Sequence, residues 1–289
     1  MSQKSYNDTA SLYLIPTPIG NLEDITIRSL NTLKQVDAVL CEDTRETSKL
    51  LNSYDIKKKL ISCYEFNEEK VKSQVISLLE EGKNLGLVTD QGSPIISDPG
   101  YIVAKEVIKA GYNVISLPGA TAFVPALTSS GIDPSPFLFY GFLNNKDSKQ
   151  KKELLSLKDF RYTLIFYEAP HRLKATLKNM LEIFGDRGIS ISREISKIHE
   201  EIYRDKISNL IDLADSLKGE FVLIVEGNKE VIDYSSLSIV EHVKMYISDE
   251  VDEKEAMKIV AKERNIPKSV VYKEYIKGKW YNETYCWFG

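Results

Sequence analysis

The sequence predicts an α/β protein with two α/β domains and a short helical tail. From residue 12 to about residue 120, short apolar runs alternate with amphipathic stretches of helical length, which is typical of a mostly parallel sheet. A second set of apolar runs begins after residue 134 and includes two that are closely spaced, which indicates a mixed sheet. After residue 230 the pattern is helical, so we expect domains at residues 11–121, 122–229 and 230–289.

The first domain is expected to contain five strands, at residues 12–15, 36–40, 60–64, 85–89 and 113–117. These runs are rich in aliphatic residues, as strands buried on both faces are. A helix is predicted after the first strand, with Asp24 or Thr26 as its cap. This helix would carry Ile27, Leu30 and Leu33 on one face.

The second domain is expected to contain strands at residues 137–142, 162–167, 189–195, 201–205 and 220–225. The third and fourth of these have a short connection, which favours an antiparallel pair. In the tail, two short helices are predicted around a break at residues 265–267. The charges of these helices are mixed rather than basic, which argues against a helix-turn-helix that binds DNA.

Composition sets limits on the partners of this 289-residue chain. A net charge of −4 argues against broad, nonspecific binding to nucleic acid, and the one sizeable basic cluster is Lys146, Lys149, Lys151 and Lys152. The three cysteines, Cys41, Cys63 and Cys286, are odd in number and lack metal-ligand spacing, so we expect neither a disulfide framework nor a metal. Residues 1–10 are polar and no segment is long enough to cross a bilayer, which predicts a cytoplasmic protein without a membrane partner.

The stretch at residues 87–100 is the strongest indication of a binding site. An apolar strand ends at Asp90, and a loop containing Gly92, Ser93 and Pro94 follows. Small residues allow a ligand to approach the backbone, and open α/β sheets bind ligands at the carboxyl ends of their strands. We expect Asp98 to cap the next helix, with Pro99 at its first position.

Further loops are expected at the carboxyl ends of strands. Residues 16–21 and 117–122 follow the first and fifth strands, residues 166–172 end a strand of the second domain, and residues 219–226 contain another. None has the glycine triplet of a dinucleotide fold or the lysine loop of an ATPase, which argues against NAD and ATP. Thr121 is expected to cap a helix, and small residues around it would let an adenine ring lie against backbone.

The residues around position 42 and the histidine at position 171 each allow more than one interpretation. Glu42, Asp43 and Arg45 either face a substrate or form a salt-bridged helix start. His171 is either a titrating group or a satisfied structural histidine.

Taken together, these loops resemble the tetrapyrrole-methylase superfamily of S-adenosylmethionine-dependent methyltransferases. More closely, the chain resembles the ribosomal RNA small-subunit methyltransferase I family, on the motifs at residues 16–22, 42–45, 90–100 and 166–172. The resemblance implies two tetrapyrrole-methylase-type α/β domains with S-adenosylmethionine in the cleft between them. It also implies a homodimer that methylates the ribose 2′ hydroxyl of a cytidine in the decoding region of 16S ribosomal RNA within the small subunit, with no DNA partner. The chain departs from the usual family pattern at Gln91, where a small residue is common.

The resemblance also implies roles for individual residues. Asp90, Gly92, Ser93 and Pro94 are assigned to the methionine part of the cofactor, and its adenosine is assigned to Gly119, Ala120, Ala122, Tyr167 and Val222. The RNA substrate is assigned to Gly20, Asn21, Glu42, Asp43, Arg45 and Arg172, with the lysines of residues 146–152 as a further basic rim. Glu168 and His171 are the candidates for accepting or relaying the proton of the ribose hydroxyl.

Two rival functions are also considered. The same fold supports methylation of a small ring such as a tetrapyrrole, and a ribosome-assembly factor without turnover is the non-enzymatic alternative.

Overall fold

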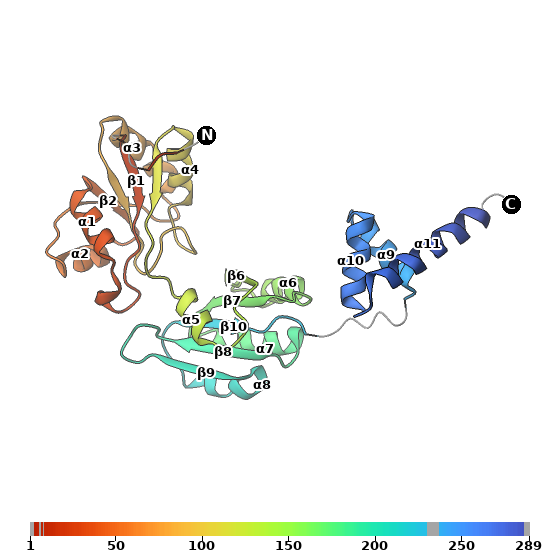
Figure 1. Ribbon diagram of the computed structural model, residues 1–289. Helices are drawn as coiled ribbons and strands as arrows, with labels where there is room; N and C mark the ends of the chain where they lie inside the picture. Colours follow the sequence, from red (N-terminus) through yellow and green to blue (C-terminus); the bar gives the residue numbers. More distant parts are fainter. Residues whose placement is uncertain (1–2, 6, 8, 230–236, 286–289) are drawn as a thin grey trace. The chain divides into compact units, whose positions relative to one another are not determined.

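The computed structural model describes the chain except for residues 1–2, 6, 8, 230–236 and 286–289. It divides into two compact units, residues 1–228 and residues 229–289. Two five-stranded sheets form the framework of the first unit. We call the parts built on these sheets the first lobe and the second lobe (Figure 1).

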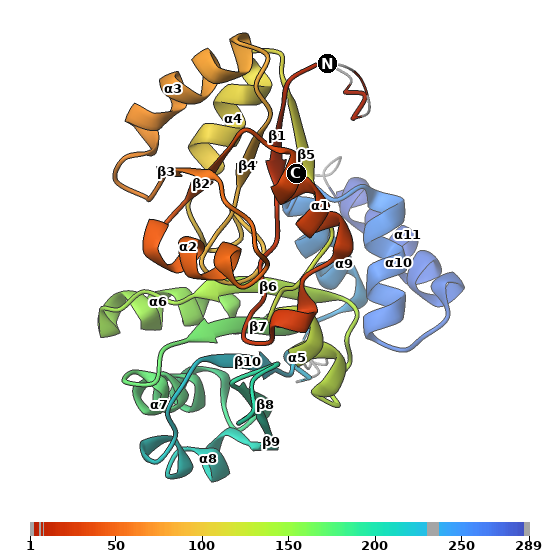
Figure 2. The ribbon, with the colours of Figure 1, turned by 90° about the vertical axis from the view of Figure 1, so that its left-hand side faces the viewer.

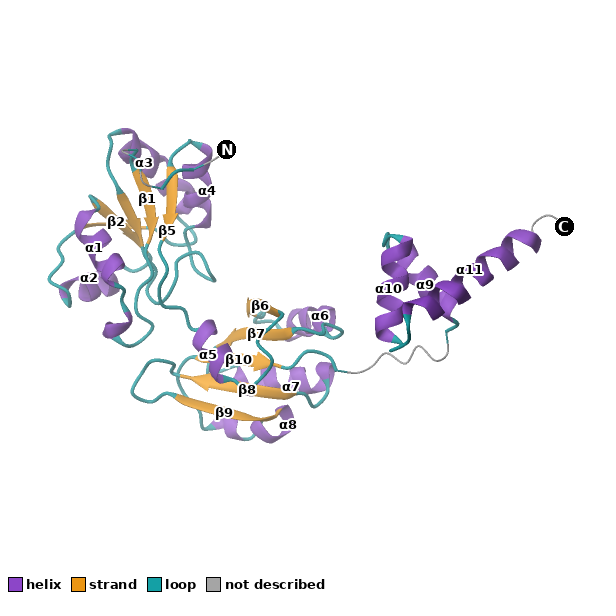
Figure 3. Ribbon diagram, viewed as in Figure 1, coloured by secondary structure: helices purple, strands orange, loops and turns teal. Residues whose placement is uncertain are grey.

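The sheet of the first lobe is entirely parallel, with the strand order β3-β2-β4-β1-β5. Its strands are β1 Ser11–Leu14, β2 Ala38–Cys41, β3 Lys59–Ser62, β4 Leu85–Leu87 and β5 Asn113–Ser116. In a parallel sheet all carboxyl ends lie at one edge, and the loops from this edge extend toward the second lobe (Figure 3).

Helices cover both faces of this first sheet. They are α1 Ile27–Gln35, α2 Thr44–Asn52, α3 Glu68–Glu80 and α4 Tyr101–Lys109, and a short 3₁₀ turn, η1 Leu22–Asp24, precedes α1. Leu40 packs with α3 and α4, whereas its neighbour Val39 packs on the opposite face with α1 and α2. Alternation along a strand explains this division, and burial on both faces explains why the strands are continuously apolar.

The second lobe has a mixed sheet with the order β6-β7-β10-β8-β9. Only β6 and β7 are parallel, and the predicted antiparallel pairing of two closely spaced strands is confirmed in β8 and β9. The strands are β6 Phe137–Phe142, β7 Thr163–Glu168, β8 Gly188–Arg193, β9 Glu201–Lys206 and β10 Phe221–Val225.

One face of the second sheet is fully covered, and the other is only partly covered. Three helices, α6 Asp147–Leu157, α7 Leu173–Phe184 and α8 Ile207–Leu210, pack on the first face around Phe166. A single short helix, α5 Phe123–Ser129, packs on the other face against Ile165 and Ile224 (Figure 2). A second 3₁₀ turn, η2 Leu213–Asp215, follows α8. The face beside α5 is therefore the one available to form a site with the loops of the first lobe.

The second unit is helical, as predicted. It contains α9 Ile239–Ser248, α10 Glu253–Glu263 and α11 Lys268–Tyr285. The predicted break lies between α10 and α11, and Val260, Val271 and Tyr275 form part of the core of this unit. The sequence prediction did not include α9, which begins with a capping box of Ser238 and Glu241.

The predicted strands differ from the observed ones by at most two residues at either end. Of the two caps proposed for α1, the structure selects Thr26, whose hydroxyl accepts a hydrogen bond from the backbone N–H of Ser29. The predicted domain boundary at residues 121 and 122 stays a prediction.

Two predicted helix starts are wrong. The helix expected to start at Pro99 begins two residues later, at Tyr101, because the Asp98 carboxylate instead accepts a 2.7 Å hydrogen bond from the Thr89 hydroxyl. Glu68 of α3 supplies the missing cap of α4 by accepting a 2.9 Å hydrogen bond from the backbone N–H of Ile102. Thr121 does not cap α5, because its hydroxyl hydrogen-bonds to Tyr167.

Candidate functional site

Three loops at the carboxyl ends of β1, β4 and β5 are joined to one another. Thr17 and Gly92 exchange backbone hydrogen bonds of 2.9 and 3.1 Å, which ties the first loop to the second. The Ser93 hydroxyl donates a 3.0 Å hydrogen bond to the carbonyl oxygen of Ala120, which ties the second loop to the third. The loops therefore form one preorganised surface rather than three independent segments.

Gly119 allows the first loop to pass close to the third loop. A Cβ atom at Gly119 would lie 2.6 Å from Cβ of Pro16, in the first loop. Only a residue without a side chain allows the first and third loops to pass so closely.

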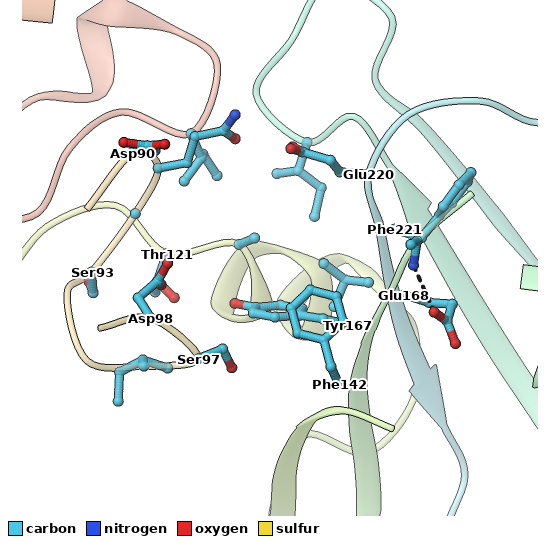
Figure 4. Close-up of a pocket in the computed structure, with 18 of the residues that line it drawn as sticks. Asp90, Ser93, Ser97, Asp98, Thr121, Phe142, Tyr167, Glu168, Glu220 and Phe221 are labelled. Carbon is cyan, nitrogen blue, oxygen red and sulfur yellow. Dashed lines mark hydrogen bonds between the residues drawn. The ribbon is translucent and has the colours of Figure 1, made fainter. Parts of the chain in front are cut away.

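A cavity of about 430 Å³ lies between this surface and the second lobe (Figure 4). This volume is in the range of small-molecule sites. The lining residues come from both lobes: Ile19, Asp90, Gln91, Gly92, Ser93, Ile96, Ser97, Asp98, Thr121, Ala122, Phe142, Tyr167, Glu168, Ala169, Pro170, Ile195, Glu220, Phe221 and Val222. Gln91 is part of the wall and leaves the cavity open.

The first-lobe side of this cavity is acidic. Burial raises the pKa of Asp98, and it also raises the pKa of Asp90. The pKa of Glu42 is raised as well, by burial first and then by the charges of Asp90 and Asp98. The charge of Asp90 contributes to the raised pKa of both Glu42 and Asp98, and a cluster of carboxylates produces a negative potential that favours a cationic ligand.

The second-lobe side of the cavity is aromatic. The ring centroid of Tyr167 lies 5.1 Å from that of Phe139 and 5.5 Å from that of Phe142, both in edge-on geometry. Phe142 is 53% exposed although it is large and apolar. An exposed ring at the wall of a cavity offers a face on which a flat ligand can stack.

A second cavity, of about 460 Å³, adjoins the first. The two share Ile19, Thr121 and Ile195 in their walls. The other lining residues of the second cavity are Asp24, Gly119, Ala120, Val124, Pro125, Ser196 and Glu200.

The residues assigned to the cofactor lie in three places: the first cavity, the second cavity and outside both. Those that line the first cavity are Asp90, Gly92, Ser93, Ala122, Tyr167 and Val222, and their contact with the cofactor stays a prediction. Gly119 and Ala120 line the second cavity instead, and Pro94 is buried outside the lining of both. Sequence reasoning missed Phe142 and Ile195, although each lies at or just beyond the carboxyl end of a predicted strand, the signal that found the other loops.

Glu168 and Arg172 form an internal ion pair. The Glu168 side chain is fully buried, and Oε1 accepts hydrogen bonds from Arg172 Nη2 at 2.6 Å and Nε at 2.9 Å. The Thr176 hydroxyl donates to Oε2, and the backbone N–H of Ala169 donates to Oε1 at 2.8 Å. In Figure 4 the carboxylate points away from Asp90 and Thr121.

This geometry bears on two predicted roles, which stay predictions. The Glu168 carboxylate already accepts hydrogen bonds from its neighbours, which disfavours it as the acceptor of a substrate proton, and the Arg172 guanidinium already donates to Glu168. The pair holds Ala169 and Pro170 in the wall of the first cavity.

His171 lies on the same loop and is exposed. Within the part of the chain that the structure describes, it lies outside the lining of both cavities, although its neighbour Pro170 lines the first. Its role as a proton acceptor stays a prediction.

Asp43 and Arg45 form a salt-bridged helix start, and their contact with a substrate stays a prediction. Asp43 caps α2 by accepting a 2.8 Å hydrogen bond from the backbone N–H of Arg45, and its carboxylate also lies 2.7 Å from Arg45 Nη2. The Arg45 side chain lowers the pKa of Asp43. Glu42 lies outside the lining of the first cavity, and the charges of Asp90 and Asp98 contribute to its raised pKa.

Gly20 and Asn21 were assigned to the substrate. In the sequence they directly follow Ile19, which lines the second cavity. Asn21 caps η1, its side chain accepting a 3.0 Å hydrogen bond from the backbone N–H of Glu23. Gly20 has a φ of +150°, and a Cβ there would lie 2.2 Å from Cγ of Lys197 in the second lobe. The first loop thus passes directly beneath the second lobe at this point.

Cys41 and Cys63 are buried free thiols, and burial raises the pKa of each. Cys286 lies outside the described residues. No described helix is both long enough and apolar enough to cross a membrane.

Comparison with known proteins identifies the family. The tetrapyrrole (corrin/porphyrin) methylase family matches residues 11–211. A ribosomal RNA small subunit methyltransferase I from Bacillus subtilis is 50% identical, over 95% of this chain and 97% of its own length. The chain belongs to the ribosomal RNA small subunit methyltransferase I family. It is therefore an S-adenosylmethionine-dependent methyltransferase.

Other relatives agree with this assignment. The methyltransferase I of Halalkalibacterium halodurans is 46% identical over 95% of this chain and 98% of its own length. The methyltransferase I of Thermotoga maritima is 44% identical and spans 75% of this chain with 99% of its own length.

Solved structures confirm the fold of this methyltransferase. The uroporphyrin-III-C-methyltransferase of Thermus thermophilus has a TM-score of 0.55 at 20% identity, and it covers 75% of this chain and 94% of its own. A cobalt precorrin-4 methyltransferase has a TM-score of 0.58 at 18% identity, with the same coverage. The predicted tetrapyrrole-methylase-type fold is therefore confirmed.

The first cavity suits S-adenosylmethionine. The ammonium and sulfonium of this cofactor are cationic and match the acidic side, while its adenine matches the aromatic side beside Tyr167 and Phe142. The residues present in this methyltransferase therefore fit the group that its family uses.

Proposed function

We propose that this methyltransferase methylates the ribose 2′ hydroxyl of a cytidine in 16S ribosomal RNA, within the small ribosomal subunit. The observation that supports the proposal most strongly is the acidic and aromatic cavity enclosed by three joined loops and the second lobe. Relatives that are 40–50% identical over at least 94% of this chain carry the name ribosomal RNA small subunit methyltransferase I.

The rival functions have less support. The ring methyltransferases among the solved structures are only 15–20% identical to this chain, a likeness that concerns the fold alone. An assembly factor without turnover is disfavoured because the first cavity stays open although Gln91, the departure from the family pattern, is part of its wall.

Asp90 and Asp98 would hold the cationic part of the cofactor, and Tyr167, Phe142 and Val222 its adenosine. When bound, S-adenosylmethionine supplies an electrophilic methyl group carried on sulfur. The contribution of the protein is to hold the ribose hydroxyl in line with that group, and positioning alone can supply a large part of the acceleration. A proton also leaves the hydroxyl, and the proposed acceptor is His171, whose neighbour Pro170 lines the first cavity.

Asp90→Asn is expected to raise the dissociation constant for S-adenosylmethionine about tenfold, because a charged partner of the cation is lost. Isothermal titration calorimetry measures the affinity directly. Asp55→Asn is the control, since Asp55 precedes β3 at the opposite edge of the sheet. Equal affinity in the two variants would refute the role of Asp90.

A basic ridge at the start of α6 is the proposed contact for the RNA backbone. Lys146, Lys149 and Lys152 are exposed and begin four residues after Phe142, which lines the first cavity. The predicted rim also included Lys151, but its ammonium lies 2.6 Å from the Glu182 carboxylate. Arg45 and Arg172 are likewise paired with acidic residues, so the ridge is reduced to three lysines.

Replacing these three lysines by glutamine is expected to weaken binding to the small subunit and to make it less sensitive to salt. Each lost phosphate contact lowers the slope of log affinity against log salt by about one. Filter binding at several salt concentrations measures this slope. A triple variant of Lys34, Lys57 and Lys59, away from the carboxyl edge of the first sheet, provides the charge-matched control. Equal slopes for both triple variants would contradict the assignment of the ridge.

The proposed function is tested by transfer of a labelled methyl group from S-adenosylmethionine to purified small subunits. The expected product is one 2′-O-methylated cytidine, which mass mapping of 16S ribosomal RNA locates. Label on a base, on another nucleotide or on no RNA would overturn the proposal.

We also propose that the enzyme is a cytoplasmic homodimer, as its family resemblance implies. Sedimentation of the purified chain tests the dimer, and a monomer at assay concentrations would contradict it.

A further inference from the structure

The second cavity is joined to the first by a shared wall of Ile19, Thr121 and Ile195. A ligand in the second cavity would therefore lie beside a ligand in the first. This is the spatial relation that methyl transfer requires between the nucleotide and the cofactor.

Ser196 hydrogen-bonds to both of the carboxylates that line the second cavity. The Ser196 hydroxyl donates to the carboxylate of Asp24, in the first lobe, and its backbone N–H donates to Glu200 Oε2 at 2.6 Å. Ser196 has a φ of +69°, a conformation that residues other than glycine rarely adopt and that recurs at functional sites. Two carboxylates from different lobes are thus held at the same cavity.

The loop that carries Ser196 is anchored at its base. The ammonium of Lys197 lies 2.8 Å from the carboxylate of Glu220 and 3.1 Å from that of Glu194. The aliphatic chain of Lys197 passes over Gly20, where no side chain fits. The positions of the two carboxylates therefore depend on contacts within and between the lobes.

We propose that the second cavity binds the cytosine base of the target nucleotide, with its ribose at the shared wall. This inference rests on the proposed function and adds the residues that recognise the base. The apolar side chains of Ile19, Val124 and Pro125 would contact the pyrimidine ring. The carboxylates of Asp24 and Glu200 would accept hydrogen bonds from its exocyclic amino group.

The chemistry of the two carboxylates gives a preference for cytosine over uracil. Aspartate and glutamate accept hydrogen bonds from the N4 amino group of cytosine, whereas uracil has a carbonyl oxygen at that position. A uracil oxygen beside these carboxylates would be a third acceptor without a donor, which is unfavourable once water is displaced from the cavity. Carboxylates also repel phosphate, so the base rather than the backbone suits this cavity.

The test compares small subunits that carry either cytidine or uridine at the nucleotide that the unchanged enzyme methylates. The unchanged enzyme is expected to methylate the cytidine subunit at least tenfold faster. Asp24→Asn and Glu200→Gln are each expected to lower kcat/KM for the cytidine subunit about tenfold. Both variants should also reduce the preference for cytidine, because a carboxamide can donate to the uracil oxygen.

Glu23→Gln is the matched control, because it removes a carboxylate next to Asp24 in the chain but outside the lining of the second cavity. It should retain the rate and preference of the unchanged enzyme. The affinity of all three variants for S-adenosylmethionine should be unchanged by calorimetry.

Three outcomes would overturn the inference. The first is an unaltered preference for cytidine in both Asp24→Asn and Glu200→Gln. The second is a weaker affinity for S-adenosylmethionine in these variants, which would assign the second cavity to the cofactor. The third is equal loss in Glu23→Gln. Failure of the proposed function itself is distinct, since the unchanged enzyme would then methylate no cytidine.

Discussion

Arg172→Met is expected to lower the free energy of unfolding by about 3–5 kcal/mol, because it leaves a buried carboxylate without its charged partner. The Glu168 side chain has no exposed surface, and Arg172 provides two of the hydrogen bonds that it accepts. Thr176 and the backbone of Ala169 remain as donors, but they carry no positive charge. Urea unfolding followed by circular dichroism measures the loss.

Two further variants make this prediction specific. Arg45→Met removes an arginine whose side chain is 83% exposed, so stability should change little although its ion pair with Asp43 has a similar length. Adding Glu168→Gln to Arg172→Met removes the unpaired charge and should restore part of the lost stability. Equal small losses in both arginine variants would show that the Glu168 pair is not structural.

Arg172→Met is also expected to affect cofactor binding. Ala169 and Pro170 lie between the two paired residues and line the first cavity, so KM for S-adenosylmethionine should rise. A loss of RNA affinity with an unchanged KM for the cofactor would instead support the phosphate contact that the sequence predicted.

Gly119→Ala is expected to weaken S-adenosylmethionine binding at least about tenfold while the fold is retained. The added Cβ would lie 2.6 Å from Cβ and 2.9 Å from Cγ of Pro16. A proline ring cannot rotate away, so the first and third loops have to separate. Separation should also strain the hydrogen bond between Ser93 and Ala120, and with it the preorganised wall of the cavity.

Gly111→Ala provides the control for this prediction. It also adds a methyl group in a turn of the first lobe, at a φ of +88°, but it meets no atom within 4 Å. It should cost about 1 kcal/mol of stability and leave the cofactor affinity unchanged. Calorimetry measures the affinity of both variants for the cofactor. Equal affinities would contradict the proposed close packing of the loops.

Much of the framework was predictable because it depends on local patterns. The apolar run at residues 85–89 lies between Asn84 and Asp90, the run at residues 113–117 ends at Pro118, and both form strands of the parallel sheet. The close spacing of residues 189–195 and 201–205 predicted their antiparallel pairing correctly. The cap of α1 was narrowed to Asp24 or Thr26, because a cap and the backbone that it caps are neighbours in the chain, and the structure selects Thr26.

The errors share a physical cause, which is competition from distant partners. Asp98 has the sequence of a helix cap, but Thr89 binds its carboxylate, and Glu68 caps the helix from 34 residues away. Thr121 was predicted to cap α5 and instead bonds to Tyr167 of the other lobe.

The sequence by itself determined the two sheets, the family and the loops that carry the site, because these features are encoded in residues adjacent along the chain. Only the tertiary structure decided which charged groups are available to ligands. Glu168 and Arg172 neutralise each other, whereas Asp24 and Glu200 meet at one cavity although 176 residues separate them. Pairing of charges depends on distances in the folded chain, and these distances are set by the packing of the two lobes.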